Sequence, residues 1–214
     1  AGAGRFFGML ANFDENLGRL RNRLAELNLE ENTILIFLTD NGGTGGTRLY
    51  NAGMRGGKAK AYDGGHRAAC FLRWPAGGLT GGRDIHRLSA HIDLLPTLID
   101  LCDLQVPQGR KYDGKSLVPL LKGNEKRWPE RTLFVHHQGR FGQKITDDRP
   151  IKYKDFAVMA DRWRLVGKEL YHMEVDPGQK TDLSRQYPTV VRKLHAAYET
   201  WWADISERFE EYCP

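Results

Sequence analysis

An acidic and an amide side chain stand next to each other where a run of apolar residues ends. Asp40 and Asn41 follow the segment 33–39, and Gly42 and Gly43 come directly after them. The two side chains offer hard oxygen ligands in one place, which suits Ca²⁺ or Mg²⁺ and not a thiophilic metal. Asp, Asn and Gly are also the residues favoured in ordinary turns. The pair therefore indicates either part of a metal site or a plain turn.

A second candidate for chemistry is the segment 55–67, which reads RGGKAKAYDGGHR. Its two Gly-Gly pairs allow backbone N–H groups to approach an anion closely. Lys58, between them, can reach that anion as a point charge, although a lysine in such a loop can equally be a solvated charge. The G-x-x-x-x-G-K-[ST] spacing of a P-loop is absent. The segment therefore predicts an anion-binding loop of another kind.

A helix, a buried strand and a glycine-rich loop are expected to position these residues. Apolar side chains recur every three or four positions over 10–27, which is the helical period. Residues 33–39 (TILIFLT) are continuously apolar, as in a strand buried on both faces of a parallel sheet. Residues 42–82 hold 13 of the 24 glycines, and 68–74 is expected to be the next strand. Layered α/β folds bind ligands beyond the carboxyl ends of such strands.

The C-terminal part is expected to be a small α+β subdomain that begins near residue 126. A helix from Asp93 precedes it. A long helix from about Thr189 ends it, with a buried apolar stripe. Between them, four short and partly alternating segments predict an antiparallel meander; they are 132–136, 156–160, 163–166 and 169–173.

Composition sets limits on the function. The chain has 214 residues and a net charge of +5. This charge suits an anionic substrate, but net charge affects how a protein associates with its partners and does not indicate its fold. It has no basic run or motif for nucleic acid, and its longest apolar run, 34–38, is too short to span a bilayer. No signal pattern opens the chain, and we expect its start to be an interior position of a longer polypeptide. Cys70, Cys102 and Cys213 form no metal or disulfide framework; the first two, among apolar residues, are expected to be core thiols.

The order of these motifs resembles the sulfatase family of the alkaline-phosphatase-like superfamily. Three motifs follow one another as in that family: an apolar strand with Asp-Asn-Gly, then R-G-G-K-x-x-x-x-[DE]-G-G, then a strand ending in Trp-Pro. The resemblance runs from about Phe6 to Trp202 and lacks a counterpart only over roughly 138–156. Further similar segments are SAHIDLLPTL (89–98), DGKSLVPLLKG (113–123), DRWRLV (161–166) and ELYHMEVDP (169–177).

The resemblance implies an α/β fold in two parts. Residues 1–125 would be the C-terminal part of the catalytic, alkaline-phosphatase-like parallel-sheet domain. Residues 126–214 would be the small α+β subdomain with its meander and long helix. Asp40 and Asn41 would be two ligands of a divalent cation, usually calcium and alternatively Mg²⁺, and Lys58 would be the catalytic, substrate-binding lysine on the sulfate.

Three further residues are candidates for binding the substrate. His66 either lines the pocket or is a satisfied loop histidine. Arg67 holds either the substrate or Asp63, which we expect to fix the loop as a hydrogen-bond acceptor. His136, like its neighbour His137, either faces the substrate cleft or ends a surface strand.

Other parts of a sulfatase site are absent from this sequence. These are an Asp-Asp pair after the first strand and a C/S-x-P-x-R motif whose Cys or Ser becomes the formylglycine nucleophile. Asp147-Asp148 follows no apolar strand and is expected to be a surface loop. We therefore expect a sulfatase fragment that binds metal weakly, is inactive alone, and self-associates through an exposed sheet edge. The formylglycine is expected in an N-terminal part outside this chain, and the family resemblance implies a periplasmic, secreted or lysosomal protein.

Two other functions remain open. One is a phosphodiesterase or phosphonate hydrolase of the same superfamily, although those relatives tend to carry histidine where Asn41 stands. The other is a non-catalytic module that binds sulfated glycans. The alcohol half of the sulfate ester, aryl or carbohydrate, stays open as well.

Overall fold

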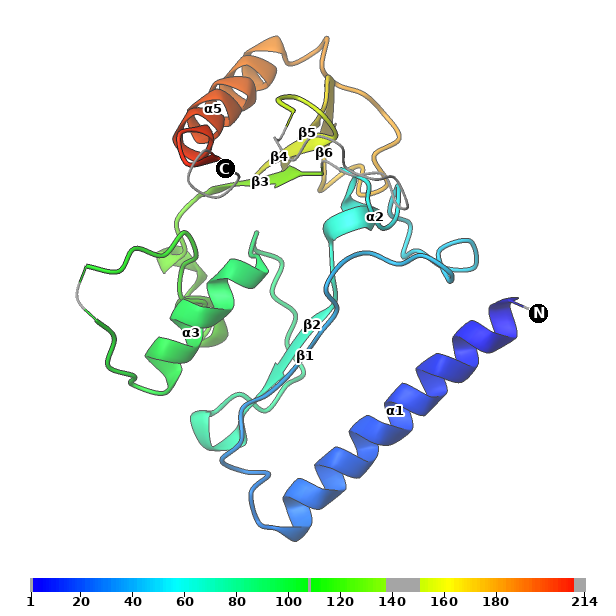
Figure 1. Ribbon diagram of the computed structural model, residues 1–214, viewed down its shortest axis with the longest axis vertical. Coiled ribbons are helices and arrows are strands. Elements are labelled where there is room, and N and C mark those ends of the chain that lie inside the picture. Colours follow the sequence, from blue (N-terminus) through cyan, green and yellow to red (C-terminus); the bar gives the residue numbers. More distant parts are fainter. Residues whose placement is uncertain (1, 108, 138–150, 210–214) are drawn as a thin grey trace. The chain divides into compact units, whose positions relative to one another are not determined.

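The computed structural model describes residues 2–107, 109–137 and 151–209, and within them the chain forms two compact units. Unit 1 comprises residues 1–12, 38–69 and 132–214, and unit 2 comprises 13–37 and 70–131 (Figure 1). Each unit is therefore built from separate parts of the sequence. The predicted boundary near residue 125 stays a prediction. Asp147 and Asp148 lie outside the described residues.

Unit 1 contains the predicted meander and C-terminal helix. Four strands form an antiparallel sheet in sequence order; they are β3 (Thr132–His136), β4 (Phe156–Ala160), β5 (Trp163–Val166) and β6 (Glu169–His172). Helix α5 (Pro188–Ser206) begins with a proline in its first turn, where the missing N–H does no harm. Figure 1 shows α5 packed beside this sheet.

The two faces of the sheet carry different side chains because successive residues of a strand point to opposite faces. Alternate strand residues pack with the buried stripe of α5, in a cluster of Phe156, Val158, Leu165, Leu170, Leu194, Tyr198 and Trp202. The intervening residues form a second cluster with the glycine-rich loop, made of Ala61, Ala157, Val166 and Tyr171. The sheet therefore lies between α5 and the loop that carries Lys58. That loop contains the short helix α2 (Asp63–His66).

Unit 2 contains the predicted helix from Asp93, found as α3 (Leu94–Leu101), and the short helix α4 (Val118–Leu121). Strands β1 (Leu35–Leu38) and β2 (Cys70–Arg73) pair with each other. Thr39 N donates to Ala69 O, and the rings of Phe37 and Phe71 stack, which fits an antiparallel register. Three single-turn 3₁₀ helices complete the elements: Pro75–Gly77, His91–Asp93 and Glu125–Arg127.

Helix α1 (Gly2–Glu26) confirms the predicted helix, but much of its apolar stripe is exposed. Phe7, Leu10 and Phe13 are each about half exposed, and the Phe13 ring contacts Phe37. Within the described ranges, no helix combines the length and the apolar character needed to cross a membrane.

The prediction that Cys70 and Cys102 are core thiols was wrong, since both residues are exposed. Cys70 lies in β2, and β1 is the one strand that pairs with β2 among the described residues. A strand residue among apolar neighbours in sequence is buried only where a second layer of structure covers the strand. The described part of unit 2 supplies too little of such a layer.

Candidate active site

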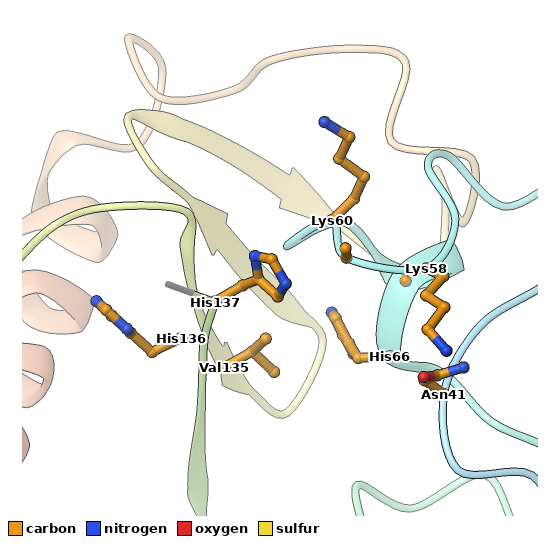
Figure 2. Close-up of a pocket in the computed structure, with 9 residues that line it drawn as sticks. Asn41, Lys58, Lys60, His66, Val135, His136 and His137 are labelled. Carbon is orange, nitrogen blue, oxygen red and sulfur yellow. The ribbon is translucent and has the colours of Figure 1, made fainter. Parts of the chain in front are cut away.

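A pocket of about 210 Å³ in unit 1 brings together residues from three separate segments. They are Asn41 after β1; Lys58, Ala59, Lys60, Gly65 and His66 of the glycine-rich loop; and Val135, His136 and His137 at the end of β3. No carboxylate is among these lining residues. Figure 2 shows the Lys58 side chain extending toward Asn41, while Lys60 points away from both. The pocket therefore presents cationic and hydrogen-bonding groups to a ligand.

Close backbone contacts explain why Asn41 and Lys58 meet. Gly42 lies directly against Gly64 and Gly65, and a Cβ added at Gly42 would stand 1.8 Å from Gly64 O. Gly42 N donates to Gly65 O, and Lys58 N donates to Gly43 O, both at 3.0 Å. Only glycine permits so close an approach of two backbones. The Asp-Asn-Gly turn and the Gly-Gly pair of α2 thus fix each other.

This packing corrects the role that was predicted for Gly64 and Gly65. Their N–H groups were expected to be available to an anion, but Gly64 N donates to Arg55 O and Gly65 N donates to Tyr62 O, both at 2.8 Å. A backbone donor that is used inside the loop has no hydrogen to offer a ligand. The N–H groups of Gly64 and Gly65 consequently take no part in binding an anion.

Asp63 anchors the loop to the sheet, as the sequence predicted for a loop-fixing acceptor. Its side chain is 2% exposed, and Oδ1 accepts a hydrogen bond from Arg164 Nε of β5 at 3.3 Å. Its backbone N–H donates to Gln179 Oε1 at 2.9 Å. Burial lowers the pKa of Arg164, while Asp63 opposes that shift, so the two charges stabilise each other. Neither Arg164 nor Gln179 was predicted, because they lie more than 100 positions away.

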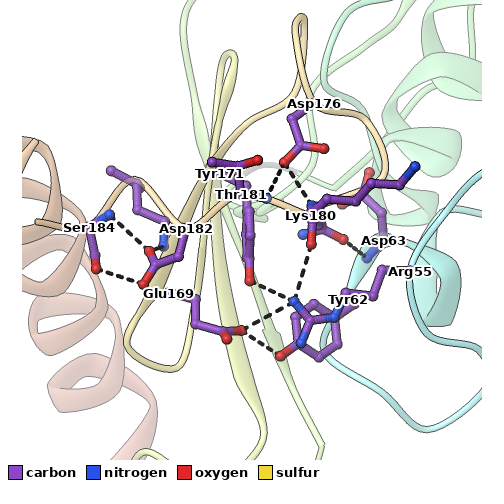
Figure 3. Close-up of polar contacts among 12 residues, drawn as sticks. Arg55, Tyr62, Asp63, Glu169, Tyr171, Asp176, Lys180, Thr181, Asp182 and Ser184 are labelled. Carbon is purple, nitrogen blue, oxygen red and sulfur yellow. Dashed lines mark hydrogen bonds and ion pairs between the residues drawn. The ribbon is translucent and has the colours of Figure 1, made fainter. Parts of the chain in front are cut away.

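Arg55 makes a second connection between the loop and the sheet (Figure 3). Its Nη1 donates to Tyr171 OH at 2.7 Å and to Gln179 O at 3.1 Å. The guanidinium lies 3.9 Å from the centre of the Tyr62 ring, and Tyr62 OH donates to Glu169 at 2.6 Å. A planar, always charged group suits this combination of stacking and forked hydrogen bonding. The loop on both sides of Lys58 is therefore tied to β6 and the segment after it.

Two of the candidate substrate-binding residues are engaged in the loop itself. His66 Nε2 lies 3.2 Å from Ala61 O and 3.9 Å from Asp63 Oδ1, and its side chain is only 17% exposed. Arg67 Nη1 lies 4.0 Å from Asp63 Oδ2, and the rest of its side chain is largely exposed. Both sequence alternatives for His66 hold at once, since it lines the pocket and is also hydrogen bonded. A substrate role for either residue stays a prediction.

His136 and His137 point to opposite faces of β3. The His136 ring lies 5.1 Å from the Trp202 ring of α5, and its Nε2 lies 3.1 Å from Ile151 O. In Figure 2, His136 points toward α5, whereas His137 lies on the same side as Val135 and His66. This is the alternation that a strand imposes on consecutive residues. The sequence left the same two alternatives open for both histidines, and it is His137 whose side chain lies on the pocket side.

Burial lowers the pKa of both His66 and His136 below the usual value of 6.5. Asp63 opposes the shift at His66, and the bond to Ile151 O opposes it at His136. Burial is the larger cause in each case, so both rings are mostly neutral at pH 7. Lys58 and Lys60 add two cationic side chains to the same pocket.

The oxygen atoms of Asp40 and Asn41 suit a hard divalent cation. Asn41 Nδ2 donates to Gly42 O at 3.1 Å, which leaves its Oδ1 as an acceptor. Asp40 is exposed, and its carboxylate has no hydrogen bond or ion pair to the described residues. Calcium prefers six to eight oxygen ligands, so these two side chains fit part of a coordination shell and not the whole of one. Asp40 itself does not line the pocket.

Two family models match this chain. A model described as sulfatase matches residues 3–104, and one described as N-sulphoglucosamine sulphohydrolase, C-terminal, matches residues 57–202. Steryl-sulfatase of Mus musculus is 34% identical over 140 residues, which are 62% of this chain and 22% of that protein. N-acetylgalactosamine-6-sulfatase of Canis lupus familiaris is 31% identical over 137 residues, 62% of this chain and 26% of that protein. The chain thus spans about a quarter of these relatives' length.

Solved structures with a similar fold cover almost the whole chain. Ps i-CgsB, in complex with k-i-k-neocarrahexaose, has a TM-score of 0.77 at 23% identity, over 94% of this chain and 43% of its own. Phosphonate monoester hydrolase of Agrobacterium radiobacter has a TM-score of 0.67 at 23% identity, over 93% of this chain and 40% of its own.

These likenesses confirm the fold class that the sequence predicted. The second family model alone covers more than half of the chain, and both curated relatives are sulfatases. The chain therefore belongs to the sulfatase family.

Proposed function

We propose that this chain supplies one side of the active site of a sulfuric ester hydrolase. The observation that carries the proposal is the shared pocket of Asn41 and Lys58. These are the residues that the family resemblance assigns to the metal and to the sulfate. The backbone contact of Gly42 with Gly64 and Gly65 holds their two segments together.

In this proposal Lys58 donates hydrogen bonds to an oxygen of the sulfuryl group, where negative charge gathers during hydrolysis. A fixed cation at such a position contributes several kcal/mol, since little reorganisation is needed at the moment of reaction. Asp40 and Asn41 would hold calcium, or alternatively Mg²⁺, which would offset charge on the same oxygens when bound. Arg55, Asp63 and Arg164 keep the lysine-bearing loop on the sheet and act as positioning residues.

The nucleophile is proposed to come from another segment, because no serine or cysteine of this chain stands in the C/S-x-P-x-R pattern. The test compares two proteins on 4-nitrophenyl sulfate with calcium present. One is the 214-residue chain, and the other is the complete protein, defined as the longest polypeptide encoded by the reading frame that contains it. We expect turnover by the complete protein and none above background by the chain alone. Turnover by the chain alone would refute the division of the site, and no turnover by either would refute the function.

A phosphonate or phosphodiester hydrolase is the second candidate, since phosphonate monoester hydrolases are among the structures of similar fold. Asn41 argues against it, because those relatives tend to carry histidine there. The complete protein is expected to hydrolyse 4-nitrophenyl sulfate faster than an aryl phosphodiester at equal concentration. The reverse order of rates would favour the second candidate.

Two further roles belong to the isolated chain. The cation-lined pocket is also compatible with a non-catalytic module for sulfated glycans. Such a module would bind heparin-like oligosaccharides, and neither the 214-residue chain nor the complete protein would hydrolyse them.

The half-exposed stripe of α1 and the short β1–β2 sheet leave apolar surface and strand edges. We propose that these edges make the isolated chain self-associate.

A further inference from the structure

His137 is the histidine of this pocket whose ring has no hydrogen-bond partner among the described residues. Its Nδ1 is buried and makes no hydrogen bond, and the described part of the chain provides none for Nε2 either. By contrast, His66 lies against Ala61 O and His136 against Ile151 O. A buried polar atom without a partner is less stable than one that is hydrogen bonded.

The backbone of His137 nevertheless has a fixed position. His137 N donates to Asp155 O at 3.0 Å, which extends the pairing of β3 with β4 by one residue. The alternation of the strand then places the His137 ring on the pocket side together with Val135, opposite His136. A side chain that is held in place but lacks a hydrogen-bond partner is suited to receive one from a ligand.

The environment also selects the tautomer. Nδ1 is buried with no acceptor nearby, and a buried N–H without an acceptor is costly. The neutral ring is therefore expected to carry its proton on Nε2, the nitrogen that is not buried. Nε2–H is a hydrogen-bond donor available to an oxygen atom in the pocket.

We propose that His137 is a specificity-determining residue and that the substrate is the sulfate ester of a carbohydrate. Nε2–H donates a hydrogen bond to a ring hydroxyl or another sugar oxygen, beside the sulfate that Lys58 contacts. This inference rests on the proposed sulfatase function. A steryl or aryl group in the same place would cover His137 and Lys60 without hydrogen bonding to them, so the pocket disfavours such alcohols.

The test is steady-state kinetics of the complete protein with calcium, on two kinds of substrate. One is 4-nitrophenyl sulfate. The other is a sulfated sugar, chosen among galactose 6-sulfate, N-acetylglucosamine 6-sulfate and N-sulfoglucosamine as the one that the wild-type protein hydrolyses with the highest kcat/KM. His137→Phe keeps the ring shape and removes the donor. We expect it to lower kcat/KM for the sulfated sugar about 10-fold to 30-fold, as for one lost hydrogen bond of roughly 1.5–2 kcal/mol. Its effect on 4-nitrophenyl sulfate is expected to stay below about threefold.

Two variants make the result specific. His137→Gln retains an N–H donor near the position of Nε2 and is expected to recover part of the lost kcat/KM. His195→Phe, on α5 and not among the residues that line the pocket, is expected to leave the ratio of the two substrates unchanged. An equal loss on both substrates, or no loss with His137→Phe, would overturn the assignment of His137 while the sulfatase function stands. If the wild-type protein hydrolyses 4-nitrophenyl sulfate but none of the sugars, the substrate class is wrong; if it hydrolyses no sulfate ester, both proposals fail.

Discussion

Replacing Lys58 by alanine in the complete protein is expected to lower kcat/KM for sulfate esters by about 10²-fold to 10³-fold. That is the usual effect of removing one donor that stabilises charge in the transition state. Lys58 lies in a loop that is tied to the sheet on both sides, through Arg55 and through Asp63. The lost interaction therefore cannot be replaced by another side chain of the same loop. Steady-state kinetics on 4-nitrophenyl sulfate measure the effect.

Lys60→Ala is the matched control for this prediction. Lys60 belongs to the same loop and lines the same pocket, but it is exposed and points away from Asn41. Its removal is expected to change kcat/KM on 4-nitrophenyl sulfate by less than about threefold, as for a solvated charge. If the two variants lose activity equally, the effect comes from the net charge of the loop, and the specific role of Lys58 is wrong.

The largest effect on stability is expected from Arg131→Met in unit 2. Asp93 is fully buried and Arg131 is 5% exposed; Arg131 Nη1 lies 2.7 Å from both carboxylate oxygens. Asp93 also accepts hydrogen bonds from Ala90 N and Lys115 N at 2.8 Å. Removing one partner of a buried ion pair leaves an uncompensated charge and costs about 3–5 kcal/mol.

Native-state hydrogen exchange on the complete protein measures this loss locally. The amides of Lys115 and Leu117 bond to Asp93 Oδ1 and Thr97 Oγ1, and they are expected to exchange at least about 100-fold faster in Arg131→Met. Arg162→Met is the control, since Arg162 forms exposed ion pairs with Asp161 and Glu174. Exposed pairs contribute about 0–1 kcal/mol. Equal exchange rates in wild type and Arg131→Met would show that the buried pair does not hold this region together.

The sequence predicted those elements whose pattern is local. The stripe of α5, from Val191 to Ile205, follows the helical period because one face of that helix packs on the sheet. The side chains of the meander strands alternate in type because the two faces of the sheet have different neighbours. One face packs against α5, and the other packs against the glycine-rich loop. A periodicity of this kind can be read without knowing what the neighbour is.

The connections that hold the site in place were not predicted. Arg164 and Gln179 contact Asp63 across more than 100 residues of sequence, and no pattern in a single sequence joins such positions. The Gly-Gly pairs were recognised as special, but the reason differed for Gly64 and Gly65: they allow two backbones to touch, and their N–H groups bond within the loop. Likewise, the sequence treated His136 and His137 alike, whereas only the direction of β3 shows that His137 shares the pocket side with Val135.

The common position of Asp40, Asn41 and Lys58 around one ligand is tested most directly by a crystal structure of the complete protein with calcium and inorganic sulfate. We predict side-chain oxygens of Asp40 and Asn41 within about 2.3–2.6 Å of the same cation. Lys58 Nζ is predicted to lie within hydrogen-bond distance of a sulfate oxygen beside that cation. A cation bound without these two oxygens, or a sulfate out of reach of Lys58, would contradict the proposed site.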